Sequence, residues 1–99
     1  MAQLIILYWR DIPSQVIVRR GRTSAKRELP RRFIEAIDAS AMRSGAASTD
    51  AYLADWRRAD PVDCGDELEA EATAAAALLD VAYDQARLVA LVAAGGHEA

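Results

Sequence analysis

The sequence predicts an α+β protein in which an N-terminal antiparallel β-hairpin packs against three to four α-helices, the C-terminal one long. Two short stretches rich in β-branched residues predict the hairpin, and a long alanine-rich stretch with helical spacing predicts the C-terminal helix. With 99 residues, 53% of them hydrophobic and 27% charged, the chain has the size and composition of one globular domain. We expect this domain to span residues 1–94, followed by a flexible tail over residues 95–99.

The first two elements are expected to be strands. Residues 4–9 (LIILYW) are continuously apolar and too short for a typical helix, which favours a central strand buried on both faces. Residues 10–14 contain Asp, Pro and Ser, and Pro13 cannot donate a hydrogen bond to a sheet, so we expect a turn of about five residues. Residues 15–19 (QVIVR) resume the β-rich pattern and would complete the hairpin.

The residues after the hairpin predict two helical segments. Thr23 or Ser24 can cap a short basic helical turn that runs to about Glu28. Pro30 then fits the first turn of a longer helix, because a proline there loses no needed hydrogen bond. Gly45 is expected to end this helix in a left-handed conformation. The apolar stripe of the helix consists of Phe33, Ile34, Ile37 and Ala41.

The middle of the chain predicts a short helix and then an extended segment. Ser48 or Thr49 is expected to cap a helix that stops before Pro61. Residues 61–64 (PVDC) follow as a brief extended segment, which we consider as a short third strand at the edge of the hairpin. The apolar side of the helix is formed by Tyr52, Leu53 and Trp56.

From Asp66 onward the sequence predicts one long helix, with acidic residues in its first turn and many alanines. Two interpretations of its apolar seam remain open. The seam packs on the hairpin and the preceding helix, or, because alanine allows a close approach, it packs against another chain and makes a homo-oligomer. The seam follows an unbroken four-three alternation: Leu68, Ala72, Ala75, Leu79, Ala82, Ala86, Val89 and Ala93.

Charge is distributed unevenly along the chain. Residues 1–43 carry nine basic and four acidic side chains, and residues 44–99 carry three basic and eleven acidic ones, so the two parts have net charges of +5 and −8. The basic side chains gather in residues 19–32, where they oppose only Glu28. They are Arg19, Arg20, Arg22, Lys26, Arg27, Arg31 and Arg32.

Three interpretations of this basic segment compete. It is a solvated face neutralised by the acidic helix, or it docks an acidic partner or anionic ligand, since arginine binds carboxylates and phosphates bidentately. In the third interpretation it binds nucleic acid, with Tyr8 and Trp9 stacking on bases. The net charge of −3 and the expected burial of these aromatic rings count against nucleic acid.

Residues 9–13 (WRDIP) form a second candidate site, at the tip of the hairpin. As structure, Trp9 would anchor the hairpin and Asp11 would cap its turn. As function, Trp9 and Arg10 are residue types enriched at the centres of protein interfaces. Both interpretations remain open.

The chain lacks the residues that metal binding and catalysis usually require. Its only histidine, His97, lies in the expected tail, and its only cysteine is Cys64, so one chain cannot assemble a tetrahedral nitrogen and sulfur site. Histidine is also the usual base in nucleophilic catalysis, and the expected tail contains the only one. Lys26 could act as a Schiff-base lysine, but the sequence favours the interpretation that it is an exposed basic side chain. We therefore expect no metal, no cofactor and no enzyme activity.

The sequence also predicts a cytoplasmic protein. Its longest apolar runs are far shorter than the ~20 residues that a membrane-spanning helix needs. The N-terminus has no basic region before its apolar run, which is atypical of a secretory signal. A single cysteine cannot form an internal disulfide, as is typical of a reducing compartment.

Three stretches carry a family resemblance: residues 8–16 (YWRDIPSQV), residues 26–38 (KRELPRRFIEAID) and residues 52–56 (YLADW). They resemble the small bacterial proteins of the virulence factor domain family. The resemblance covers nearly the whole chain and is clearest in its first two thirds. Related domains form the C-terminal part of the larger conserved virulence factor C, where they are similar to interaction modules.

Stand-alone members similar to this chain tend to be encoded beside methylenetetrahydrofolate reductase-like and corrinoid-dependent methyltransferase proteins. The resemblance implies a non-catalytic accessory subunit that binds such an enzyme of one-carbon metabolism, and it supplies no catalytic residues. The alternative is a small nucleic-acid- or anion-binding module that uses residues 19–32. The candidate binding residues are Trp9, Arg10, Asp11, Arg19, Arg20, Arg22, Lys26, Arg27, Arg31 and Arg32.

Overall fold

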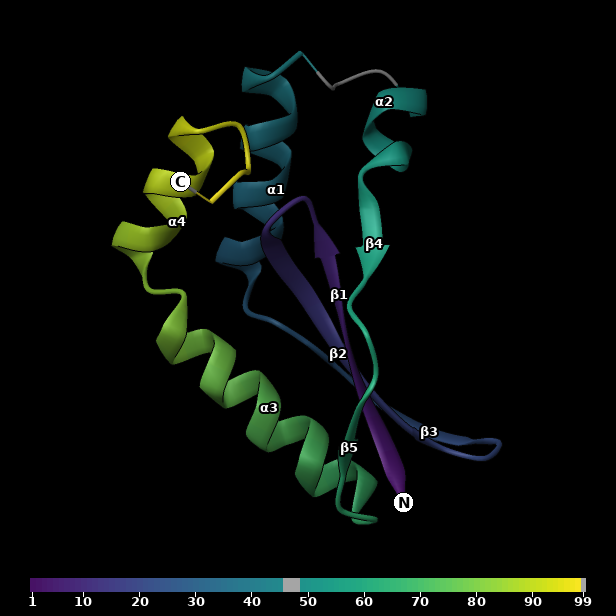
Figure 1. Ribbon diagram of the computed structural model, residues 1–99. Helices are drawn as coiled ribbons and strands as arrows, with labels where there is room; N and C mark the ends of the chain where they lie inside the picture. The colour runs from purple at the N-terminus through teal and green to yellow at the C-terminus, as the bar shows by residue number, and fades with distance from the viewer. Residues whose placement is uncertain (46–48, 99) are drawn as a thin grey trace.

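In the computed structural model, which describes residues 1–45 and 49–98, a five-stranded antiparallel sheet packs against four helices (Figure 1). The strand order is β3-β2-β1-β4, and β5 also pairs with β1. The α+β class, the N-terminal hairpin and the helices after it are confirmed. The elements are β1 (Ala2–Trp9), β2 (Ile12–Arg20), β3 (Thr23–Glu28), α1 (Arg31–Arg43), α2 (Thr49–Ala54), β4 (Trp56–Arg58), β5 (Val62–Cys64), α3 (Leu68–Ala82) and α4 (Gln85–Ala93).

β1 is the central strand, with β2 on one side and β4 and β5 on the other. The turn after it is shorter than the predicted five residues, because only Arg10 and Asp11 separate β1 from β2. Arg10 adopts a left-handed φ of 54°, which a tight turn of this kind requires. A register shift between Leu7 and Tyr8 lets Pro13 lie within β2.

The predicted helical turn over residues 23–28 is wrong, because these residues form β3. Gly21, with a φ of 60°, turns the chain at the end of β2, and the ladder then continues with Arg20 opposite Thr23. Burial of Ala25 and pairing with residues 15–20 of β2 outweigh the local capping signal. Residues 61–64, in contrast, do include a short strand, since β5 pairs with β1.

α1 follows the prediction closely. Phe33, Ile37 and Ala41 are buried, whereas Ile34 is 40% exposed, and Gly45 has the expected left-handed φ of 77°. α2 is shorter than predicted and ends at Ala54, because the chain then pairs with β1 and Trp56 belongs to β4. Ser48, one of the two predicted caps of this helix, lies outside the described residues.

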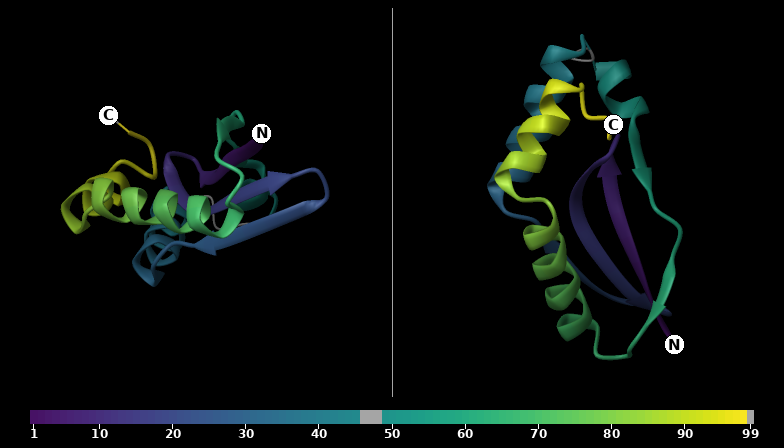
Figure 2. Two further views of the ribbon diagram at one scale, coloured as in Figure 1. Left: turned by 90° about the horizontal axis from the view of Figure 1, so that it is seen from below. Right: turned by 60° about the vertical axis from the view of Figure 1, so that its left-hand side comes forward.

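The single C-terminal helix predicted from Asp66 is divided into α3 and α4. Asp84 has the extended φ and ψ of −66° and 175°, and its side chain accepts a hydrogen bond from the Arg87 backbone nitrogen at 2.9 Å. The break changes the direction of the chain, so α3 packs along β2 and β3 while α4 packs against α1 (Figure 2). It also changes which residues face inward: Leu88 and Leu91 are buried, whereas Val89 of the predicted seam is 57% exposed.

Two groups of buried side chains form the core. One joins Trp9 and Ile12 of the hairpin to Phe33 of α1 and Leu88 of α4. The other lies between the sheet and α3, where Val16 and Val18 meet Ala72. None of the described helices combines the length and the apolar character needed to cross a bilayer.

The described residues of the predicted tail contact the β1–β2 turn. Gly96 folds back on α4 through its nitrogen, 2.7 Å from the Leu91 carbonyl, and its own carbonyl accepts from the Asp11 nitrogen at 2.9 Å. The Glu98 nitrogen donates to the Asp11 carboxylate at 2.6 Å. The flexibility expected for residues 95–99 stays a prediction.

Candidate functional site

Trp9 and Arg10, two of the candidate binding residues, hold the β1–β2 turn to other parts of the chain. The Trp9 ring is fully buried, and its Nε1 donates to the Tyr52 carbonyl at 2.8 Å. The Arg10 guanidinium donates to Asp55 Oδ2 at 3.0 Å and to the Gly95 carbonyl at 2.6 Å. Because the chain itself satisfies their polar groups, we interpret both residues as structural anchors.

Asp11 links the same turn to β4 and to the C-terminal segment. Its Oδ1 accepts from Arg57 Nη2 at 3.2 Å, and its Oδ2 accepts from the Glu98 nitrogen. Arg57 Nε also donates to the Arg10 carbonyl at 3.0 Å. The turn is therefore the point at which β1, β4 and the chain end meet.

The basic segment over residues 19–32 divides into two groups. Arg20 and Arg27 contact the start of α3 and the residues before it. Arg20 lies 3.9 Å from Asp66, which precedes the helix, and Arg27 pairs with Glu69 and contacts Thr73 of α3. These contacts match the interpretation of a basic face neutralised by the acidic helix.

Arg32 has a structural role at the end of α3. Its guanidinium donates to the carbonyls of Asp80 and Tyr83 at 2.7 and 2.6 Å, and to the Asp80 carboxylate at 2.6 Å. The last carbonyls of a helix have no partner within that helix. Arg32 supplies that partner from α1, at the junction of α3 and α4.

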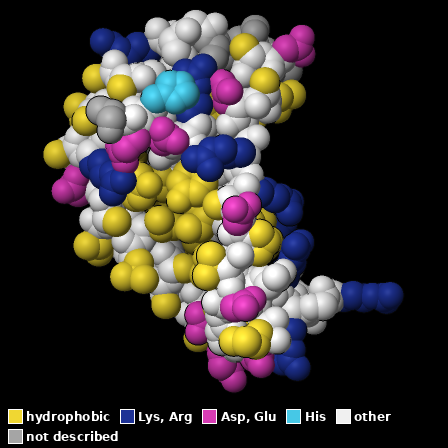
Figure 3. Space-filling model, in the orientation of Figure 1, with side chains coloured by type: hydrophobic (Ala, Val, Ile, Leu, Met, Phe, Trp, Pro, Cys, Tyr) yellow, Lys and Arg dark blue, Asp and Glu magenta, His cyan; other side chains and the backbone are white. Residues whose placement is uncertain are grey.

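The other group consists of exposed basic side chains. Arg19, Arg22 and Lys26 are exposed, and none of them has a salt-bridge partner among the described residues. They lie in residues 19–26, the end of the β2–β3 hairpin, which we call the basic arm. The arm extends beyond the helices in the left view of Figure 2, and Figure 3 shows a basic side chain reaching outward at the lower right. Arg31 lies outside the arm and is 89% exposed beside Glu35.

One edge of the arm is open for strand pairing. Among the described strands, β3 pairs only with β2. The Leu29 nitrogen donates to the Ser14 carbonyl, so these two residues form a hydrogen-bonded pair. Hydrogen-bonded and non-hydrogen-bonded pairs alternate along an antiparallel ladder, so this pair determines which residues of β3 bond to β2. By that alternation the backbone N–H and C=O groups of Ser24, Lys26 and Glu28 point away from β2. Within this row the Lys26 carbonyl accepts from Arg27 Nη1 at 2.7 Å. An edge of this kind can pair with a further strand.

A polar cavity of about 300 Å³ lies at the meeting point of β1, β4 and the α3–α4 junction, and sequence reasoning missed it. We call it the tyrosine pocket. The Arg57 guanidinium lies 4.6 Å from the centre of the Tyr8 ring, and the Arg87 guanidinium lies 3.9 Å from that of Tyr83. The four-residue spacing of Tyr83 and Arg87 is the one sequence signal for this group. The pocket is lined by Tyr8, Asp11, Arg57, Ala59, Tyr83 and Glu98.

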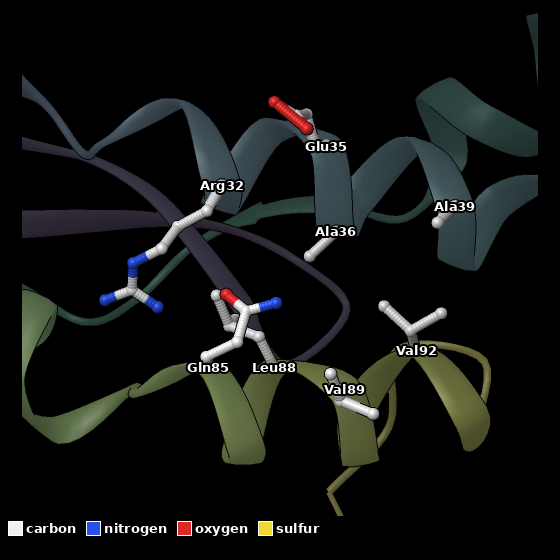
Figure 4. A pocket seen from close by; sticks show the side chains of 8 residues that line it. All are labelled: Arg32, Glu35, Ala36, Ala39, Gln85, Leu88, Val89 and Val92. Atoms are coloured by element: carbon white, nitrogen blue, oxygen red, sulfur yellow. The ribbon is translucent and has the colours of Figure 1, made fainter.

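A second cavity, of about 250 Å³, lies between α1 and α4 (Figure 4). Ala36 and Leu88 form its apolar floor, and Val89 and Val92 project from α4 beside them. Its charged groups are Arg32, which is bonded to the end of α3, and Glu35 at the rim. The cavity thus offers apolar contact and little polar recognition.

Neither a metal centre nor an activated thiol is found in the described part of the chain. No three His, Cys, Asp or Glu side chains come together there as a metal ion would need. Partial burial, followed by the charges of Glu71, Asp66 and Asp63, raises the pKa of the Cys64 thiol above its usual value. A raised pKa makes the thiol a poorer nucleophile at neutral pH.

Comparison with known proteins gives one match. A family model described as "Virulence factor" matches residues 7–92. No curated protein and no solved structure matches the chain.

Proposed function

The chain belongs to the virulence factor family, and from this premise we propose that it is a non-catalytic interaction subunit whose basic arm binds an acidic segment of a protein partner. The observation that supports this most is the set of exposed, unpaired charges of Arg19, Arg22 and Lys26 on a projecting hairpin. Arginines that lack an internal partner retain the bidentate geometry that carboxylates fit.

The mode of binding that we propose is strand addition along β3. Its outward N–H and C=O groups would pair with the backbone of an extended segment, and Lys26 and Arg22 would meet acidic side chains of that segment. Backbone pairing provides affinity, and charge complementarity selects an acidic sequence over a basic one.

The resemblance supplies candidate partners. A methylenetetrahydrofolate reductase-like protein or a corrinoid-dependent methyltransferase is the partner class that we propose, which makes the chain an accessory subunit of one-carbon metabolism.

Nucleic acid is the second candidate, because the same unpaired charges would also attract a phosphate backbone. The aromatic residues count against it. No Phe, Trp or Tyr occurs in residues 10–32, so the arm has no ring on which a base could stack. Trp9 and Phe33, the aromatic residues on either side of this stretch, are both buried.

A charge-reversal experiment tests the proposal. The tagged chain should retain the candidate enzyme in stoichiometric amount from its native host at moderate salt, as identified by mass spectrometry. The variant Arg19→Glu with Lys26→Glu should lose the enzyme. Arg43→Glu with Arg58→Glu, two exposed sites away from the arm, changes the net charge equally and should retain it.

Two outcomes would contradict this function. Equal retention by the arm variant and its control would show that the arm does not bind the partner. Recovery of nuclease-sensitive material only, with an affinity that falls steeply with salt, would favour the nucleic-acid candidate.

A further inference from the structure

The tyrosine pocket is built by segments that lie far apart in the sequence. Tyr8 comes from β1, Asp11 from the β1–β2 turn, Arg57 from β4, Tyr83 from the α3–α4 junction and Glu98 from the chain end. On the face drawn in Figure 3, charged side chains of both signs lie next to a group of hydrophobic ones. A cavity of about 300 Å³ that joins ring faces to charged groups can hold a small molecule with an apolar body and a charged end.

Two guanidinium groups are fixed in place at the pocket: Arg57 lines it, and Arg87 lies beside it, in contact with the lining residues Tyr83 and Glu98. Each guanidinium stacks on a tyrosine ring and also donates to a backbone carbonyl, Arg57 to Arg10 and Arg87 to Ala82, the latter at 3.1 Å. A guanidinium held in this way loses little further side-chain entropy when it binds an anion.

The chain itself shows which anion this arrangement accepts. The Glu98 carboxylate accepts from both Nε and Nη2 of Arg87, a forked contact in which one oxygen receives two donors. Glu98 lies near the end of the chain and is 44% exposed, and Arg87 is 39% exposed. An exposed ion pair of this kind contributes little to stability, so an external carboxylate can compete with it.

We propose that the tyrosine pocket binds a small molecule with a carboxylate on a planar apolar body, and that Glu98 is the internal occupant of the carboxylate position. The carboxylate of the small molecule replaces Glu98 on Arg87, and its planar body lies against Tyr8, Tyr83 and Ala59. This site is separate from the basic arm and does not depend on the function proposed for the arm.

Titration with benzoate, followed by the backbone amide signals of the full chain in NMR spectra at constant ionic strength, tests the proposal. We expect shifts for residues around Tyr8, Tyr83 and Gly96, with a dissociation constant on the order of 1 mM. Benzamide, which has the same shape and no charge, should produce no shifts there. The variant Glu98→Gln should bind benzoate about threefold to fivefold more tightly, because the internal competitor is lost.

Control variants separate this effect from a general change in charge. Asp38→Asn removes an exposed carboxylate from α1 and should leave the benzoate affinity unchanged. Arg87→Gln in the Glu98→Gln background should abolish the shifts. Equal shifts with benzamide, shifts outside the pocket, or equal benzoate affinity in the wild type and Glu98→Gln would each overturn the proposal.

Discussion

Arg10 destabilises the fold through its backbone conformation and stabilises it through its side-chain hydrogen bonds. Its φ of 54° is unfavourable for any residue with a Cβ atom, yet its guanidinium joins Asp55 and the Gly95 carbonyl, and only 15% of the side chain is exposed. The hydrogen bonds to two distant segments therefore compensate for the strained turn.

Replacing Arg10 separates these two contributions. Arg10→Ala should lower the free energy of unfolding by about 1–3 kcal/mol, because it removes the charged hydrogen bonds and keeps the strained conformation. Arg10→Gly removes the same bonds and relieves the strain, so it should be about 1 kcal/mol more stable than Arg10→Ala. Urea unfolding followed by tryptophan fluorescence measures both; equal stability of the two variants would show that the turn is unstrained.

Cys64 should react slowly with alkylating reagents. Its raised pKa leaves a smaller thiolate fraction at neutral pH, and only the thiolate attacks iodoacetamide. We expect the folded chain to react more slowly than the chain unfolded in urea, and Glu71→Gln to react faster because it removes a negative charge near the thiol. Mass spectrometry of the alkylated fraction over time measures these rates. A folded rate equal to the unfolded one would contradict the prediction.

Among the elements, the junction of α3 and α4 decides how the helices cover the sheet. Asp84 caps the start of α4, and Arg32 bonds the last carbonyls of α3 from another helix. The backbone groups at both ends of the break therefore have hydrogen-bond partners. Two short helices can then run in different directions, which one straight helix could not.

Removing the cap should weaken α4. Asp84→Ala leaves the Arg87 nitrogen without its acceptor and should lower the free energy of unfolding by about 1 kcal/mol. Asp84→Asn keeps a side-chain oxygen and should retain most of the stability. Thermal unfolding followed by circular dichroism compares the two variants. Equal loss in both would show that the charge of Asp84, rather than its hydrogen bond, stabilises the junction.

At the scale of the whole molecule, the opposite charges of the two parts of the chain meet across the fold. Of the seven salt bridges among the residues that the structure describes, four join a basic residue of 1–43 to an acidic residue of 44–99. The acidic residues of these four pairs are Asp55, Asp66, Glu69 and Asp80. Of the five basic side chains without a salt bridge to a described residue, three lie on the basic arm, which explains why a chain with a net charge of −3 still presents a cationic projection.

Salt should therefore destabilise the fold. Because exposed pairs contribute about 0.2–1 kcal/mol each and are screened by ions, raising sodium chloride from low salt to about 0.5 M should lower the melting temperature by a few degrees. Arg27→Gln, which lacks the pair with Glu69, should show a smaller decrease. A melting temperature that is unchanged or higher in salt would show that these pairs contribute nothing to stability.

The sequence by itself determined the elements whose signals are local. The apolar run of β1, the stripe of α1 and the left-handed Gly45 follow from side-chain periodicity and backbone preference, and they are found where they were predicted. The charge polarity of the chain is also a sequence property, and residues 19–32 are its most basic stretch. The family resemblance was also inferred from the sequence, and the family model that matches residues 7–92 confirms it.

The tertiary structure alone decided which side chains are free. Pairing with β2 converted residues 23–28 from a predicted helical turn into an edge strand, and the break at Asp84 moved the buried face of α4 to Leu88 and Leu91. Contacts over more than 40 residues likewise satisfied Trp9 and Arg10, and brought Tyr8 and Tyr83 into one pocket. The local spacing of residue types along the sequence does not predict such contacts, because they depend on how whole elements pack against one another.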